Sequence, residues 1–301
     1  MDLFDEKRGA DILIFGLEIG RLKRPFRLGE LRIIPDFDIR RYLTGYEDDD
    51  IDFIADQAKF AEYRHKPKSL SFSLMTDDLA LIPLRLFKTG WLSGMKVIPV
   101  TNVGGIQTRG ELNTARHLMG QIWADGNFRV SGKELPEIRK KYGQLLKMPK
   151  GYLEMALRRF SRCYKYIQHS EYPGANELDD YWVDLIIALE SITTKRHEGI
   201  TANLARRTAK LLGKNQSEVE AIENKAREMY DERCAIVHGE DKDITDDPTH
   251  EKRFVEAENL RSLVRDTINA CLELLTSPGL TITKPTGVQK TMAETIDEKY
   301  P

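Results

Sequence analysis

The spacing of apolar residues changes near Leu135, and this change limits the folds that the chain can adopt. Before it, apolar residues form short runs or alternate with polar ones, as in strands, where successive side chains point to opposite faces. After it, they recur every three or four positions, as on one face of an α-helix. The sequence therefore predicts an α+β domain over residues 1–134, an all-α helical bundle over residues 135–276 and an extended or disordered tail over residues 277–301.

Short apolar segments in the first domain have the length or the alternation of strands. They occupy residues 12–17, 70–74 and 95–100. A fourth segment, residues 79–86, contains Pro83, which cannot donate a ladder hydrogen bond, so this strand is expected at a sheet edge or at a bulge. Helices are expected over residues 50–61 and 112–123.

The second domain carries five apolar stripes with helical spacing. They run through residues 153–167, 178–192, 200–211, 219–237 and 254–274. The stripe at 178–192 widens until the helix is apolar almost all round, which is typical of a helix in the core. Consecutive amphipathic helices on short connections predict an antiparallel bundle.

Helix ends in the bundle are indicated by glycines and by one capping pattern. Gly213 is expected to close the third helix and Gly239 the fourth, because glycine is favoured just past a helix C-terminus. The sequence Ser217-Glu218-Val219-Glu220 resembles a capping box and is expected to open the fourth helix.

The composition is that of a soluble globular protein, with 41% hydrophobic and 31% charged residues. No apolar stretch approaches the roughly 20 residues that span a bilayer, and the first residues are too charged for a signal peptide. Three scattered cysteines, Cys163, Cys234 and Cys271, form no Cys-x-x-Cys pair, which favours reduced thiols over a zinc site or disulfides. We therefore expect a cytoplasmic protein without a membrane partner.

Arg233 lies in the middle of the apolar arc of the fourth helix. A guanidinium there is costly unless it is paired or lines a solvent-filled cleft. One interpretation is an arginine that is salt-bridged, for example to Asp180 or Glu190. The other is a cation held in a groove to receive an anion.

His238 follows five residues later, just before Gly239. On an ideal helix, which turns about 100° per residue, Arg233 and His238 point about 140° apart. The two side chains converge only if the last turn tightens or unwinds, which Gly239 permits. Alternatively, His238 is simply a favourable cation at the negative end of the helix dipole.

Two further charged residues border apolar stripes. Arg207 projects close to the stripe of the third helix, and Glu190 lies on the flank of the most buried helix. Together with Arg233 and His238, they suggest a polar pocket within the bundle.

Three segments resemble the Apea-like HEPN domains, in the order found in that family. The strongest is Tyr230-Asp231-Glu232-Arg233-Cys234-Ala235-Ile236-Val237-His238-Gly239, in which an arginine follows a tyrosine by three residues and an Ile-Val-His-Gly ending follows. The helices around Glu190 and Arg207 are similar to two upstream helices of the family. The resemblance covers residues 152–275 and departs from the family at Cys234, where many active members carry a small polar residue.

The resemblance implies a homodimeric bundle that acts as a metal-independent endoribonuclease in phage defence, toxin–antitoxin or RNA-processing systems. In this sequence His238 would move the proton of a ribose 2′-hydroxyl, and Arg233 would bind the scissile phosphate. Arg207, Glu190, Tyr230 and Cys234 would support these two residues, and no cofactor or metal is expected. The alternative is a non-catalytic HEPN module that binds a nucleotide or a partner protein, such as a toxin's inhibitor.

A basic strip also fits an RNA partner. Residues 137–168 contain nine basic side chains against two acidic ones. Arg158, Arg162 and Lys165 share one side of the first bundle helix, where they could follow a phosphate backbone or simply face solvent. The first domain would then sense a trigger or select the RNA.

Two other patterns do not indicate sites. Residues 48–50 are a run of aspartates without other ligands at suitable spacing, so a solvated loop is the better interpretation than a metal site. Gly104, Gly105 and Gly110 lack a following Gly-Lys-Ser/Thr and do not form a phosphate-binding loop motif.

Overall fold

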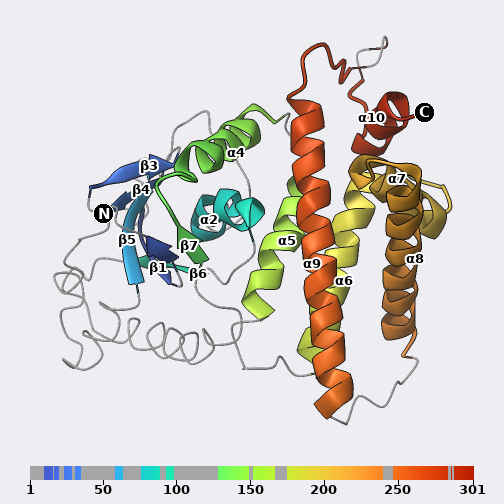
Figure 1. Ribbon diagram of the computed structural model, residues 1–301, viewed down its shortest axis with the longest axis horizontal. Coiled ribbons are helices and arrows are strands. Elements are labelled where there is room, and N and C mark those ends of the chain that lie inside the picture. Colours follow the sequence, from blue (N-terminus) through green and yellow to red (C-terminus); the bar gives the residue numbers. More distant parts are fainter. Residues whose placement is uncertain are drawn as a thin grey trace, which may run out of the picture. The chain divides into compact units, whose positions relative to one another are not determined.

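The computed structural model describes two compact units, whose main boundary lies between Leu146 and Lys147 (Figure 1). The described residues are 10–15, 17–19, 24–28, 31–34, 58–63, 76–88, 93–97, 128–148, 152–166, 175–239, 247–283, 286 and 288–301. The predicted boundary at 134/135 is wrong, because α4 (Leu135–Lys147) belongs almost entirely to the first unit. The change of periodicity marks where a helix begins, but it does not say which core that helix joins.

In the first unit, five of the described strands form an antiparallel sheet in the order β3-β4-β5-β1-β6. These strands are β3 (Phe26–Leu28), β4 (Leu31–Ile34), β5 (Ala58–Tyr63), β1 (Ala10–Phe15) and β6 (Ser93–Val97). Leu13 of β1 pairs with Phe60 on one side and Met95 on the other. A separate parallel pair joins β2 (Leu17–Ile19) to β7 (Phe128–Val130).

The predicted α+β character of this unit agrees with its sheet and with α2 (Thr76–Phe87) and α4, although two segments were assigned to the wrong element. The strand runs 12–17 and 95–100 are confirmed in part, as β1 and β6. The strand predicted over residues 79–86 is wrong, because this segment belongs to α2, with Pro83 inside the helix. Residues 81–86 are all buried, and an apolar run buried all round does not reveal its period.

The helix predicted over residues 50–61 is also wrong at its end, since Ala58–Tyr63 is the strand β5. Within β5, each residue from 60 to 63 pairs with both β1 and β4, so neighbouring strands fix its extended conformation. The predictions for residues 70–74, 112–123, 48–50 and the glycines at 104–110 lie outside the described residues.

The second unit is the helical bundle that the sequence predicts. Its helices are α5 (Glu154–Tyr166), α6 (Ala175–Thr193), α7 (Ile200–Leu212), α8 (Gln216–His238), α9 (Asp247–Leu275) and α10 (Met292–Lys299). α6 is central and contacts each of the other five (Figure 1). Trp182, Leu185 and Leu189 of α6 are buried, as expected for a helix that is apolar almost all round.

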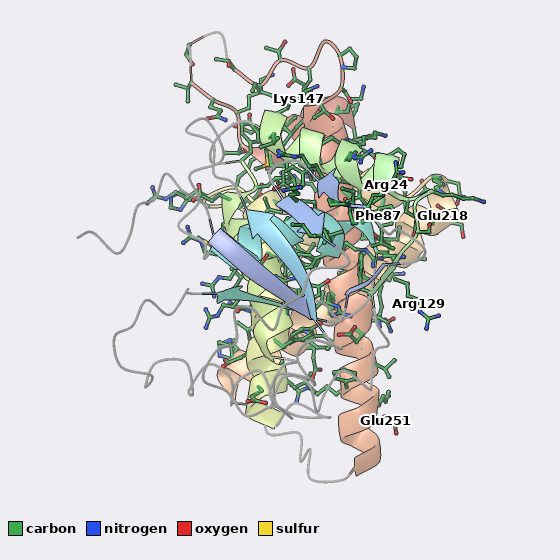
Figure 2. The ribbon with its side chains drawn as sticks, turned by 90° about the vertical axis from the view of Figure 1, so that its left-hand side faces the viewer. Arg24, Phe87, Arg129, Lys147, Glu218 and Glu251 are labelled. Atoms are coloured by element: carbon green, nitrogen blue, oxygen red, sulfur yellow. The ribbon has the colours of Figure 1, made fainter. Side chains whose placement is uncertain are left out.

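The ends of α8 were predicted with one error. Its N-cap is Asn215, whose side chain accepts a hydrogen bond from the backbone N–H of Glu218, so the helix begins before the Ser217 box. Glu218 and Glu251, both labelled in Figure 2, mark the N-terminal turns of α8 and α9. Gly239 adopts the left-handed conformation (φ 67°) and ends α8, as predicted.

Gly213 ends α7 for a different reason than expected. Its backbone is extended (φ −74°), so the left-handed conformation is not used. A Cβ at this position would lie 2.5 Å from Cγ2 of Val219, and glycine therefore permits the close approach of α7 and the first turn of α8.

The predicted extended or disordered tail is wrong over residues 292–299, which form α10. Thr291 and Glu294 make a capping box at its start. Met292, Ala293, Thr295 and Ile296 are buried, and α10 packs against α6 and α7. The apolar side of this short helix is too brief to be recognised as a stripe in a polar segment.

Candidate functional site

The last third of α8 carries both predicted catalytic residues and has no buried side chain after Tyr230. Upstream, Met229 and Tyr230 are buried, and the backbone carbonyl of Met229 accepts a hydrogen bond of 3.0 Å from Trp182 Nε1 of α6. Further along, residues 232–236 are half-buried, whereas Val237 is 51% exposed and His238 is exposed. The helix therefore leaves the bundle surface gradually over the segment that contains the motif.

Arg233 is half-buried beside Tyr230 and within electrostatic reach of Glu190. Its guanidinium carbon lies 5.9 Å from the centroid of the Tyr230 ring, a cation–π arrangement. Burial raises the pKa of Glu190, and the positive charge of Arg233 opposes part of that rise. We call Arg233, Glu190, Tyr230 and Cys234 the Arg233 cluster.

The two charges of the Arg233 cluster do not form an ion pair with each other. Within the described ranges, Nε of Arg233 and Oε1 of Glu190 are both buried and have no hydrogen-bonding partner. Among the described residues, Arg233 forms no salt bridge with Asp180 or Glu190, and Glu190 interacts with it only through its charge. A guanidinium and a carboxyl that lie near each other with unused hydrogen-bonding capacity can both bind a polar ligand.

Tyr230 and Cys234 lie one turn apart on α8. Burial raises the pKa of Tyr230, and the nearby charge of Glu190 raises it further. A hydrogen bond between the Tyr230 hydroxyl and the Cys234 thiol acts in the same direction. Cys234 is a free, half-buried thiol. The Tyr230 hydroxyl is therefore held as a neutral group that can donate a hydrogen bond.

His238 is the last residue of α8, and the helix continues through it without unwinding. The N–H of Gly239 donates to the carbonyls of both Ala235 and Ile236, so the tightening of the helix comes only after His238. On this regular helix the Arg233 and His238 side chains start about 140° apart. A regular helix therefore does not by itself bring these two side chains of one chain together, and their convergence remains a prediction.

Arg207 is occupied elsewhere and does not join the Arg233 cluster as a free cation. It is 1% exposed, and its Nε and Nη2 donate 2.8 Å hydrogen bonds to Oδ1 and Oδ2 of Asp297 in α10. Its Nη2 also donates to Glu198 Oε2 at 3.0 Å, and its Nη1 donates to the carbonyl of Thr193 at 2.6 Å. The predicted supporting role for Arg207 is therefore corrected to a structural one.

The predicted RNA-backbone strip on α5 is largely paired with carboxylates. Arg158 Nη2 lies 3.3 Å from Glu154 Oε1, and Arg162 Nε lies 3.3 Å from Oδ2 of the buried Asp184. Asp184 also pairs with Arg159. The side chain of Lys165 lies outside the described residues. Glu154 and Asp184 thus offset part of the positive charge of Arg158, Arg159 and Arg162, which weakens the case for a phosphate-binding strip on α5.

A bridge between three helices was not identified from the sequence. Arg253 of α9 places Nη2 2.7 Å from Asp179 Oδ1 of α6 and 3.6 Å from Glu232 Oε1 of α8. Glu232 directly precedes Arg233. Residues 179, 232 and 253 lie on three different helices and belong to no common sequence motif. The sequence therefore offers no sign that their side chains meet.

Comparison with protein-family models, curated proteins and solved structures gives no match to this chain. Within the described ranges, no three histidine, cysteine, aspartate or glutamate side chains are grouped closely enough to hold a metal ion. Likewise, none of the helices described is both long and apolar enough to cross a membrane.

Proposed function

We propose that the protein is a metal-independent endoribonuclease in which Arg233 and His238 act on the RNA. The observation that supports this most directly is the half-buried Arg233, whose Nε has no hydrogen-bonding partner among the described residues. A guanidinium held in this way can receive a phosphate, for which its planar, multi-donor geometry is well suited. The resemblance of residues 230–239 to the Apea-like HEPN motif supplies the reaction class.

The chemistry follows from the two side chains. His238 accepts the proton of a ribose 2′-hydroxyl, and the 2′-oxygen attacks the adjacent phosphorus. Arg233 stabilises the negative charge that develops on the phosphoryl oxygens. The bond to the 5′-oxygen breaks, and this oxygen takes up a proton. The products are a 2′,3′-cyclic phosphate and a 5′-hydroxyl, so a 2′-deoxyribose at the cleavage site cannot react.

The active form is proposed to be a homodimer. In one chain, Arg233 and His238 start on different sides of α8, and a second copy can supply the missing neighbour across a two-fold interface. Exposed Val237 and half-buried Ile236 beside the motif offer apolar surface for that contact. Each Arg233 would then face a cleft between the copies.

The direct test is cleavage of total cellular RNA by the purified protein in EDTA, followed by mapping of the new ends. We expect 2′,3′-cyclic phosphate and 5′-hydroxyl ends, and no cleavage by a His238→Ala protein that is otherwise folded. Cleavage that needs Mg²⁺, or equal cleavage by the variant, would contradict the proposal.

A second function, nucleotide or partner-protein binding without cleavage, is favoured by the same unpaired Arg233 Nε and Glu190 Oε1. It requires an anion-binding site but no proton transfer. If the wild-type protein cuts no RNA, titration with nucleotides followed by calorimetry tests this function, and Arg233→Leu should abolish the binding.

A further inference from the structure

Arg253, in the N-terminal part of α9, joins the segment of α8 that bears the motif to α6. Its guanidinium lies between Asp179 Oδ1, at 2.7 Å, and Glu232 Oε1, at 3.6 Å, and its side chain is only 9% exposed. Both are contacts between charges, since Asp179 Oδ1 accepts no hydrogen bond from the described residues. Burial raises the pKa of Asp179, and the charge of Arg253 opposes that rise. A single cation thus holds carboxylates from two different helices.

The last two turns of α8 have little apolar packing to fix them. Ala226, Met229 and Tyr230 are the buried residues of this helix in the part that the structure describes, and none lies beyond Tyr230. Two residues after Tyr230, the carboxylate of Glu232 forms an ion pair with Arg253 of α9. The direction of α8 beyond Tyr230 is therefore sensitive to this contact.

Buried ion pairs of this kind contribute little net stability, because desolvation offsets most of the attraction. What this contact provides is position, because one buried cation attracts the carboxylates of α6 and α8 toward the same place. Because Glu232 adjoins Arg233 in the helix, a shift of one moves the other. We infer that Arg253 is a positioning residue, which holds the end of α8 so that Arg233 and His238 present their side chains in a fixed orientation. This inference rests on the proposed ribonuclease activity.

The test compares Arg253→Leu, Arg253→Lys and Glu232→Gln with Arg265→Leu in the full chain. Arg265 lies on the same helix and pairs with its neighbour Asp266, so this variant controls for the loss of an arginine from α9. Two quantities are measured: hydrogen exchange of the backbone amides of residues 231–239, and kcat and KM for RNA cleavage per folded molecule. The exchange measurement does not depend on any enzymatic activity.

We expect Arg253→Leu to speed exchange over residues 231–239 and to lower kcat about 10- to 100-fold, with KM changed much less, since misplaced groups cost rate more than binding. Arg253→Lys should keep part of the protection from exchange and part of the kcat of the wild type, because an ammonium can still bridge two carboxylates. Arg265→Leu should behave as wild type. If Arg253→Leu does not fold, Glu232→Gln, which leaves the Asp179 contact, should show the same changes to a smaller degree.

Unchanged exchange over residues 231–239 in folded Arg253→Leu or Glu232→Gln protein would overturn the inference. So would faster exchange without any loss of kcat, because the segment would then be held for a purpose other than cleavage. A wild-type protein that cuts no RNA would instead contradict the proposed function and the catalytic part of this inference. In that case exchange would still decide whether Arg253 holds the end of α8.

Discussion

Arg207 of α7 and Asp297 of α10 form a two-pronged ion pair, with both hydrogen bonds at 2.8 Å, between residues 90 positions apart. Glu198, from the connection between α6 and α7, binds the same guanidinium at 3.0 Å. The arginine is buried, whereas Asp297 keeps 30% of its side chain exposed. This contact fixes α10 on the bundle and explains why a polar segment at the end of the chain is helical and packed.

Replacing Asp297 by asparagine should destabilise the protein by about 1–3 kcal/mol at pH 7, because Arg207 stays buried with one carboxylate fewer. The hydrogen bonds from Arg207 hold the pKa of both Asp297 and Glu198 below their ordinary values. Carboxylates with a lowered folded-state pKa stabilise the fold above their unfolded pKa, and this contribution is lost as the pH falls. Urea unfolding between about pH 7 and pH 3 should show a constant difference in unfolding free energy between wild type and Asp297→Asn down to about pH 4, and a smaller difference at pH 3, where the carboxyl of the unfolded chain begins to take up its proton. A gap independent of pH would contradict the expected linkage.

Truncating Ile296 to alanine should cost about 2–4 kcal/mol, because its side chain is fully buried on the inner side of α10. Val288→Ala, in the exposed segment just before α10, is the matched control, and it should change stability by less than about 0.5 kcal/mol. Thermal unfolding measures both. Equal effects of the two variants would mean that α10 does not pack on the bundle in solution.

His238→Ala should lower RNA cleavage on the order of 10²-fold or more while leaving the unfolding midpoint unchanged. The reason is that His238 is exposed at a helix end and contributes little to the core. Arg233→Lys should also be poor, since an ammonium does not reproduce the planar grip of a guanidinium on phosphate. His197→Asn, at another exposed histidine with a left-handed backbone (φ 66°) that asparagine tolerates, is the control and should cleave normally.

Glu190→Gln should gain stability relative to wild type as the pH rises from about 4 to 8. Burial raises the pKa of Glu190, so the folded state of the wild type favours the protonated acid and loses stability as that acid ionises. Glutamine stays neutral and avoids this loss. Chemical denaturation at both ends of the range gives the comparison, and a pH-independent difference would argue that Glu190 is not held in a desolvated environment.

Val237→Glu should convert the proposed dimer into a monomer and reduce cleavage with it. Val237 is half-exposed beside the motif, and a carboxylate there places like charges opposite each other across a two-fold interface. Light scattering at about 50 µM protein reports the mass, because association depends on concentration. A wild-type protein that is monomeric at this concentration and fully active would rule out the dimeric site.

The sequence by itself determined the helical bundle, because apolar residues repeated every three or four positions specify one buried face per helix. It also determined the end of α8, where Gly239 supplies the left-handed residue that closes the helix. The place of Arg233 within the apolar arc of α8 could be predicted for the same reason. Each of these features depends on residues within a few turns of one another.

Only the tertiary structure decided which partner each charge has. Arg207 and Arg233 both border apolar stripes, yet Arg207 is saturated by Glu198 and Asp297 whereas Arg233 keeps an unpaired Nε beside Glu190. An ion-pair partner that lies tens of residues away produces no periodic pattern in the sequence, so residue spacing cannot predict it. Packing also decided that residues 79–86 form a buried helix and that residues 58–63 form a strand, since both segments take their conformation from neighbours distant in the chain.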